Sequence, residues 1–142
     1  LGKMYAEAIL EHGGRIVIAD YDLIKAKQVV EELRTTYGDR AQAVFVDVTN
    51  KSSIYDAASL HPEVNVLINN AAKDPKVTSD GKVHGAFETL TLQEWREGIS
   101  TSLDGTFLCS QVFCNKFTDD GGGIIINISS DLVLLRLNQR KY

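Results

Sequence analysis

Four short apolar runs, separated by segments with helical periodicity, constrain the fold of this chain most strongly. The runs cover residues 15–19, 41–46, 64–68 and 124–128. Short, predominantly apolar runs are typical of parallel strands buried on both faces. Strands that alternate with helices of about ten or more residues form βαβ units. The sequence therefore predicts an α/β fold, a single domain over residues 1–142 with a doubly wound parallel sheet.

The segments between the runs carry helix signals. Helices are predicted over residues 2–12, over 51–60, and from Asp22, a capping residue, to Gly38, with a long helical stretch over 92–117. Three buried faces follow from spacings of three and four residues. These faces are Tyr5, Ala8, Ile9 and His12; Ala26, Val29, Val30, Leu33 and Tyr37; and Ile99, Leu103, Thr106, Phe113 and Phe117.

Composition excludes several classes of function. With 15 Lys+Arg against 19 Asp+Glu the net charge is −4, and no basic cluster favours a nucleic-acid surface. No apolar run approaches the roughly 18 residues of a membrane span. The two cysteines, Cys109 and Cys114, are five residues apart in a helical stretch, so we expect no disulfide and a reducing cytoplasm. The three histidines are isolated and lack metal-ligand spacing, so no metal site is predicted.

Each apolar run leads into polar side chains, which are Asp20, Asp47, Asn69-Asn70 and Ser129-Ser130. Strand ends are often polar merely because the chain is leaving the core, and any one of these residues alone is open to that interpretation. In an open parallel sheet, however, ligands bind beyond the carboxyl ends of the strands. Polar residues at all four ends therefore favour a binding site.

The spacing between the first helix and the first apolar run indicates a dinucleotide. A helix beginning at Leu1-Gly2 is followed, about twenty residues later, by the strand that ends at Asp20. At this spacing a pyrophosphate sits on the helix N-terminus and the acidic residue receives the adenosine ribose. The carboxylate accepts hydrogen bonds from ribose hydroxyls and repels a 2′-phosphate. Because Tyr21, and no Arg or Lys, follows Asp20, the sequence predicts NAD over NADP.

On these motifs the chain resembles the N-terminal half of a short-chain dehydrogenase/reductase. Asn69-Asn70-Ala71-Ala72 is similar to the family's Asn-Asn-Ala-Gly, and Asn127-Ile128-Ser129-Ser130 to the strand that delivers its catalytic serine. The resemblance implies an incomplete Rossmann-type fold in three layers, without the first strand and the C-terminal part. It implies one catalytic residue, Ser130. It also implies a set of cofactor-binding residues, which are Leu1, Gly2, Asp20, Asp47, Val48, Asn69 and Ala71.

The activity implied by the resemblance is NAD-dependent hydride transfer between a nicotinamide and a secondary alcohol or ketone, with a sugar-like polyol as one candidate. The family's Tyr-x-x-x-Lys pair is expected beyond Ser130, and Tyr142 is interpreted as a loop residue rather than this tyrosine. Ser102 stands where the family often has the asparagine of its proton relay. The family also implies a homodimer or homotetramer.

Two further expectations follow. A non-catalytic dinucleotide-binding or dimerisation module is the alternative function, favoured by Ser102 and by the absence of the Tyr/Lys pair from these residues. Because the chain opens at Leu1 inside a motif, we also expect a fragment. The family's first strand lies at the centre of its sheet, so the 142 residues are expected to form two half-sheets and not to fold stably alone.

Overall fold

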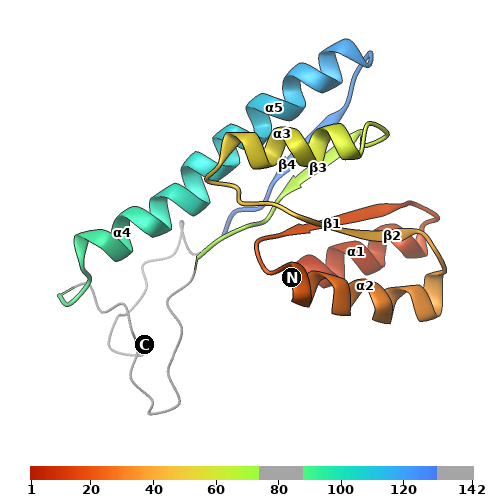
Figure 1. Ribbon diagram of the computed structural model, residues 1–142, viewed down its shortest axis with the longest axis horizontal. Helices are drawn as coiled ribbons and strands as arrows, with labels where there is room; N and C mark the ends of the chain where they lie inside the picture. Colours follow the sequence, from red (N-terminus) through yellow and green to blue (C-terminus); the bar gives the residue numbers. More distant parts are fainter. Residues whose placement is uncertain (74–87, 131–142) are drawn as a thin grey trace.

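A computed structural model describes residues 1–73 and 88–130 of the chain. Helices and strands alternate along it, as the sequence predicts (Figure 1). The elements are α1 (Gly2–Glu11), β1 (Ile16–Asp20), α2 (Leu23–Tyr37), β2 (Ala41–Phe45), α3 (Lys51–Leu60), β3 (Val66–Asn69), α4 (Leu92–Ile99), the π-helical turn η1 (Ser100–Asp104), α5 (Gly105–Asp119) and β4 (Ile124–Asn127).

The four strands form two parallel pairs. β1 pairs with β2, with Asp20 opposite Phe45, and β3 pairs with β4, with Asn69 opposite Asn127. Within residues 1–73 and 88–130 no backbone ladder joins the two pairs. The expectation of two half-sheets is therefore confirmed, while the expectation that this stretch does not fold stably alone stays a prediction.

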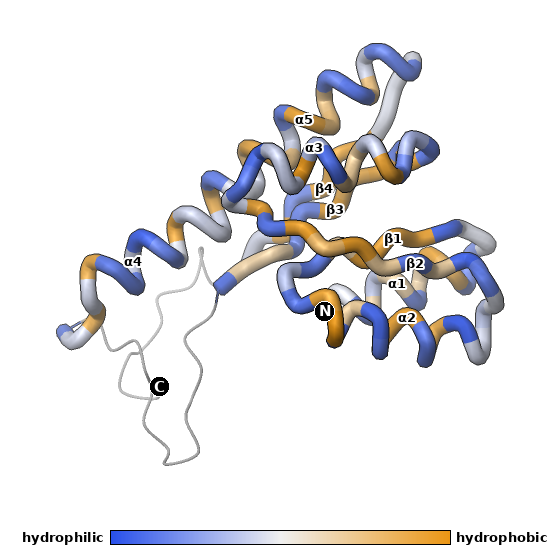
Figure 2. The backbone as a smooth tube through the Cα atoms, in the orientation of Figure 1, coloured by the Kyte–Doolittle hydropathy of each residue, from blue (hydrophilic) through white to orange (hydrophobic). Residues whose placement is uncertain are grey.

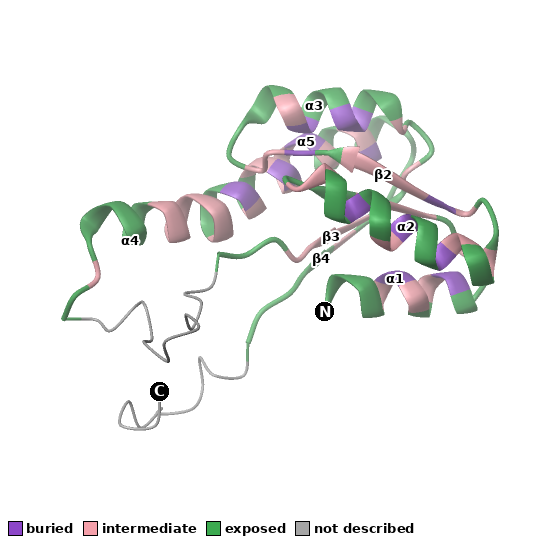
Figure 3. Cartoon of the chain, turned by 60° about the horizontal axis from the view of Figure 1, so that its bottom comes forward, coloured by how far each residue is buried: buried purple, intermediate pink, exposed green. Residues whose placement is uncertain are grey.

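Helices cover both faces of the strands, which gives the three layers of a Rossmann-type fold. On one face of β1 and β2, Ala6 and Leu10 of α1 pack with Val30 and Leu33 of α2 against Ala41. On the other face a second core joins the end of β2 to helices α3 and α5. Its buried members are Val46, Ile54, Ala57, Ala58, Cys109 and Val112. Figure 2 shows β1 and β2 as apolar segments, and Figure 3 shows the buried positions along the helices.

Helix ends follow the predicted signals, whereas one helix face does not. The Asp22 side chain accepts a hydrogen bond from the Lys25 N–H, and α2 ends at Gly38 with φ of 68°. In α1, however, the buried residues are Ala6 and Leu10, and the predicted positions Ala8 and His12 are exposed. The prediction for α1 is wrong because this short helix packs against both α2 and β1, and these two contacts together determine which of its side chains are buried.

The long helical stretch is interrupted by η1. The Gly105 N–H bonds the Ser100 carbonyl, five residues earlier, and the Thr106 hydroxyl donates to the Ser102 carbonyl over 2.7 Å. A π-turn inserts one extra residue, which rotates the following side chains by about 100° relative to a continuous α-helix. Leu103 was predicted on the same face as Phe117, but it is 62% exposed while Phe117 is buried.

No helix within the described ranges combines the length and the apolar character needed to cross a bilayer.

Candidate functional site

The carboxyl ends of β1 and β2 bring Asp20 next to the segment that leads to Asp47. The Val46 N–H donates to the Asp20 carbonyl over 3.1 Å, which extends the ladder one step past the strands. The Asp20 side chain is exposed, and its Oδ1 accepts the Asp22 N–H over 2.8 Å. This bond fixes one carboxylate oxygen on the backbone, while Oδ2 has no hydrogen bond to any residue that the structure describes.

Asp22 and Lys25, at the start of α2, are the charged residues next to Asp20. Asp22 forms an ion pair of 2.7 Å with Lys25. The hydrogen bond from Lys25 holds the pKa of the Asp22 carboxyl below its usual range. Tyr21, between the two aspartates, is exposed, and its ring lies 5.6 Å from that of Phe45.

Asp47 shapes the turn between β2 and α3. Its Oδ1 accepts both the Thr49 N–H, over 2.9 Å, and the Thr49 hydroxyl, over 2.7 Å. Its own N–H donates to Ser53 Oγ over 3.0 Å. The next residue, Val48, is partly buried and packs on the core that contains α3 and α5. Hydrogen bonds of Asp47 with Thr49 and with Ser53 therefore hold the turn, and packing on the core holds Val48 within it.

The N-terminus of α1 lies beside the end of β3. A Cβ atom built on Gly2 would lie 3.4 Å from Nδ2 of Asn70, so the first turn of this helix approaches the Asn69-Asn70-Ala71 segment closely. Helices α2, α3 and α4 each carry a side-chain cap, from Asp22, Asn50 and Thr91 respectively. Helix α1 begins after Leu1, and none of the described side chains accepts a hydrogen bond from its first turn. Unpaired N–H groups at such a helix start are suited to an anion.

The Asn69 side chain connects three elements. Its Nδ2 donates to Oδ1 of Asn127, the last residue of β4, over 2.7 Å, and to Oγ of Ser110 in α5 over 3.0 Å. Both N–H groups of the amide are therefore engaged within the protein. The backbone of Asn69 also accepts the Ile128 N–H over 2.9 Å. Ser130 follows two residues later and is exposed.

Ser110 and Asn127 are not among the site residues that the sequence predicts. The in-register pairing of two asparagines at matching strand ends is the signal that could have identified Asn127. Ser110 is 41 residues from Asn69 along the chain, and no local pattern connects the two.

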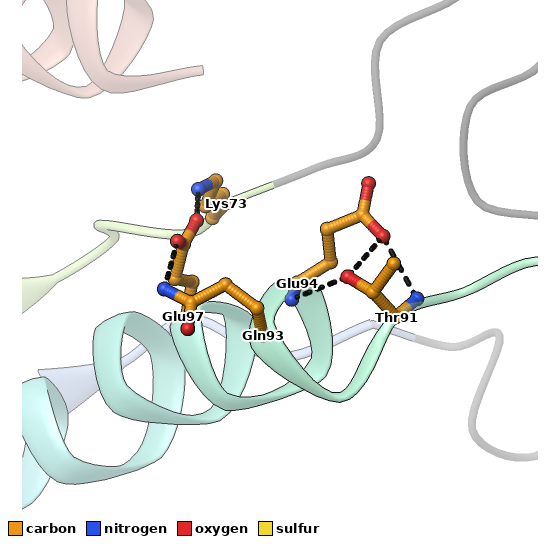
Figure 4. A network of polar contacts seen from close by, with 5 residues as sticks. All are labelled: Lys73, Thr91, Gln93, Glu94 and Glu97. Carbon is orange, nitrogen blue, oxygen red and sulfur yellow. Dashed lines mark hydrogen bonds and ion pairs between the residues drawn. The ribbon is translucent and has the colours of Figure 1, made fainter.

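A second polar network links the segment after β3 to α4 (Figure 4). Lys73, directly after Asn70-Ala71-Ala72, forms an ion pair with Glu97, which also accepts a hydrogen bond of 2.7 Å from Gln93. The hydrogen bond from Lys73 holds the pKa of Glu97 below its usual range. At the start of α4, Thr91 and Glu94 form a reciprocal capping box.

A hollow of about 480 Å³ lies at the other end of β4. It is lined by Cys114, Phe117, Thr118, Gly121, Gly122, Gly123 and Ile125. These residues lie near the amino end of the strand, away from the polar strand ends. The hollow is therefore separate from the candidate site.

The structure places the predicted residues in two groups. Asp20 and Asp47 follow the neighbouring strands β1 and β2, while Gly2 lies beside Asn70 after β3 and Ser130 follows β4, the strand paired with β3. Tyr142 lies outside the described residues.

Comparison with known proteins identifies relatives over nearly the whole chain. A family model described as short chain dehydrogenase matches residues 1–140. The 3-oxoacyl-[acyl-carrier-protein] reductase FabG of Aquifex aeolicus is 31% identical over 134 residues, which is 92% of this chain and 51% of that protein. The 2,5-dichloro-2,5-cyclohexadiene-1,4-diol dehydrogenase LinX of Sphingobium indicum is 31% identical over 135 residues, covering 92% of this chain and 50% of that protein.

The solved structures agree with these matches. The crystal structure of a short chain dehydrogenase from Bacillus anthracis superimposes with a TM-score of 0.73 at 27% identity, covering 89% of this chain and 50% of that one. The chain thus spans about half the length of the curated relatives it matches.

Proposed function

This chain belongs to the short-chain dehydrogenase family, and we propose that its protein is an NAD-dependent oxidoreductase acting on a secondary alcohol or the corresponding ketone. The observation that carries the proposal is the approach of Gly2, in the first turn of α1, to Asn70 at the end of β3. This arrangement provides N–H donors for a pyrophosphate at the edge where the strand ends meet.

The adenosine half of the cofactor fits the ends of β1 and β2. Asp20 has one carboxylate oxygen held by the Asp22 N–H and a second oxygen to accept from ribose hydroxyls. Asp22 is paired with Lys25, so the negative charge that disfavours a 2′-phosphate and supports NAD over NADP is that of Asp20. Asp47 and Val48 would hold the adenine, with Val48 supplying apolar contact.

The nicotinamide half would lie beyond β3 and β4. The backbone of Asn69 and Ala71 would line the cofactor there. When bound, the cofactor supplies or accepts the hydride. Ser130 would hold the substrate oxygen by a hydrogen bond from the end of β4, and the tyrosine and lysine of the family's motif, expected after Ser130, would move the proton.

The substrate class is a secondary alcohol or ketone. One relative is named as a reductase of a 3-oxoacyl group and another as a dehydrogenase of a ring diol, and both names describe interconversion at such a carbon. The ring diol favours a sugar-like polyol, which also carries hydroxyls on a ring.

We also propose a homodimer or homotetramer in the cytoplasm. Helix α4 buries no residue, and an apolar stripe runs along α4, η1 and α5. The stripe consists of Leu92, Trp95, Leu103 and Phe107, each more than half exposed. A second copy of the same helices would cover this surface.

Calorimetric titration of the full-length protein with NADH and NADPH, followed by absorbance assays at 340 nm with secondary alcohols and ketones, tests the proposal. Tighter binding of NADH, with turnover of a cyclic polyol, would support it. Preference for NADPH would overturn the assignment of Asp20. Binding without turnover of any alcohol or ketone would favour the alternative, a non-catalytic dinucleotide-binding or dimerisation module, to which Ser102 at the position of the relay asparagine also points.

A further inference from the structure

Two side chains with no assigned role, Asn127 and Ser110, hold the ends of β3 and β4 together. Both accept hydrogen bonds from the Asn69 amide, at 2.7 Å and 3.0 Å. The three residues come from β4, α5 and β3, and the Asn69–Ser110 bond is partly shielded from water. The network therefore ties two strand ends and one helix to a single side chain.

The network lies at the carboxyl end of β4, just before Ser130. Asn127 is the last residue of the strand, and the backbone bond from Ile128 to Asn69 is the next step of the ladder. Ser129 and Ser130 then continue outside the strand. The direction in which the chain leaves β4 is thus set within three residues of Ser130.

We propose that Asn127 and Ser110 are positioning residues, which fix the exit of β4 and with it the distance between Ser130 and the Asn69-Asn70-Ala71 segment. This inference rests on the proposed function, in which Ser130 holds the substrate oxygen and the Asn69-Asn70-Ala71 segment lines the nicotinamide. The distance between these two parts of the protein then sets the distance between the substrate and the nicotinamide. A displacement of about 1 Å in such a geometry costs up to about 100-fold in rate.

The alternative is a brace that serves only stability. A brace would lower the unfolding midpoint when it is removed and would leave kcat unchanged in the protein that remains folded. A positioning network lowers kcat at an unchanged affinity for the cofactor. The two are therefore separated by measuring kcat, the Kd for NADH and the unfolding midpoint on the same variants.

The experiment compares four variants of the full-length protein. Asn127→Leu and Ser110→Ala each remove one acceptor from Asn69, whereas Asn127→Asp keeps an acceptor at the same position. Asn65→Leu is the matched control, because Asn65 is exposed and lies next to the opposite end of the same strand pair. Hydrogen exchange of residues 126–130 is measured on each variant together with kcat and Kd.

We expect faster exchange of residues 126–130 in Asn127→Leu and Ser110→Ala, with kcat lower by about ten-fold and Kd for NADH within two-fold of wild type. Asn127→Asp and Asn65→Leu should behave like wild type. Unchanged exchange and kcat in Asn127→Leu would overturn the inference, as would an equal loss in Asn65→Leu. If the wild type binds no nicotinamide cofactor, the proposed function fails, and the exchange of residues 126–130 alone decides whether the network fixes the strand exit.

Discussion

Gly105, the first residue of α5, packs directly on the side chain of Val48: a Cβ atom on Gly105 would lie 2.8 Å from Cγ2 of Val48 and 3.1 Å from its Cβ. Gly105 is buried, and Val48 directly follows Asp47 in the turn after β2. The helix that contributes Ser110 to the network of Asn69 thus also supports the turn proposed to hold adenine.

Gly105→Ala is therefore expected to destabilise the protein by about 1–3 kcal/mol, because the added methyl group overlaps Val48 in a packed interior. Urea unfolding of the full-length protein measures the change. Gly98→Ala is the matched control, since no described atom lies within 4 Å of the added methyl group. Equal stability of the two variants would show that Val48 moves aside without cost.

Asp20→Asn tests the choice of cofactor. The amide keeps one acceptor but removes the charge, so we expect the Kd for NADH to rise by about ten-fold, in line with the loss of one charge-assisted hydrogen bond. The Kd for NADPH should fall, because the repulsion of the 2′-phosphate is weaker. Asp56→Asn, at an exposed position of α3, should change neither constant. A parallel loss of both cofactors would contradict the assigned role of Asp20.

Trp95→Glu tests the apolar stripe on α4, η1 and α5. A charge at the centre of an interface between two copies is unfavourable, so light scattering should report a smaller particle than for wild type. Leu60→Glu replaces an apolar residue on α3 that is more exposed than Trp95, and it should leave the mass unchanged. An unchanged mass in Trp95→Glu would place the interface elsewhere.

The ion pair between Lys73 and Glu97 gives a pH dependence of defined sign. The pKa of Glu97 is lowered in the folded protein, so its contribution to stability is present above the pKa of an unfolded glutamate, about 4.3, and is lost as the pH falls through the lower folded value. Glu97→Gln should thus melt below wild type at pH 7, and the difference should shrink below about pH 4.3. Glu88→Gln serves as control, and a difference independent of pH would contradict the prediction.

The two cysteines should differ in reactivity. Burial raises the pKa of the Cys109 thiol to about 11, whereas Cys114 is exposed. At pH 8 a thiol with that pKa is about one-thousandth thiolate, and the thiolate is the reactive form. Peptide mapping after brief alkylation of the native protein should find Cys114 modified and Cys109 intact. Unfolding in urea should expose both, and rapid native modification of Cys109 would contradict its burial.

The sequence was sufficient to predict the strand ends, because each apolar run stops at a polar residue and parallel strands align those ends. The helix cap at Asp22 was an equally local signal. Helix faces were harder to predict. The side of α1 that is buried depends on α2 and β1 together. The π-turn before Gly105 adds one residue to the helix, so a constant period of about 3.6 residues places the later side chains on the wrong face. The Asn69–Ser110 bond joins residues that only the tertiary fold brings together.

The division of the strands into two pairs has a mechanical consequence. Among the described residues the pair β1–β2 is linked to the elements around β3 mainly by apolar contacts, in which Val44, Val46 and Val48 pack with α3, α5 and Leu67. Such contacts have no preferred direction, unlike a hydrogen-bonded ladder. The methyl groups of the three valines therefore separate β1 and β2, proposed to hold the adenosine, from β3 and β4, proposed to hold the nicotinamide. A change in the volume of these side chains should change the distance between the two strand pairs.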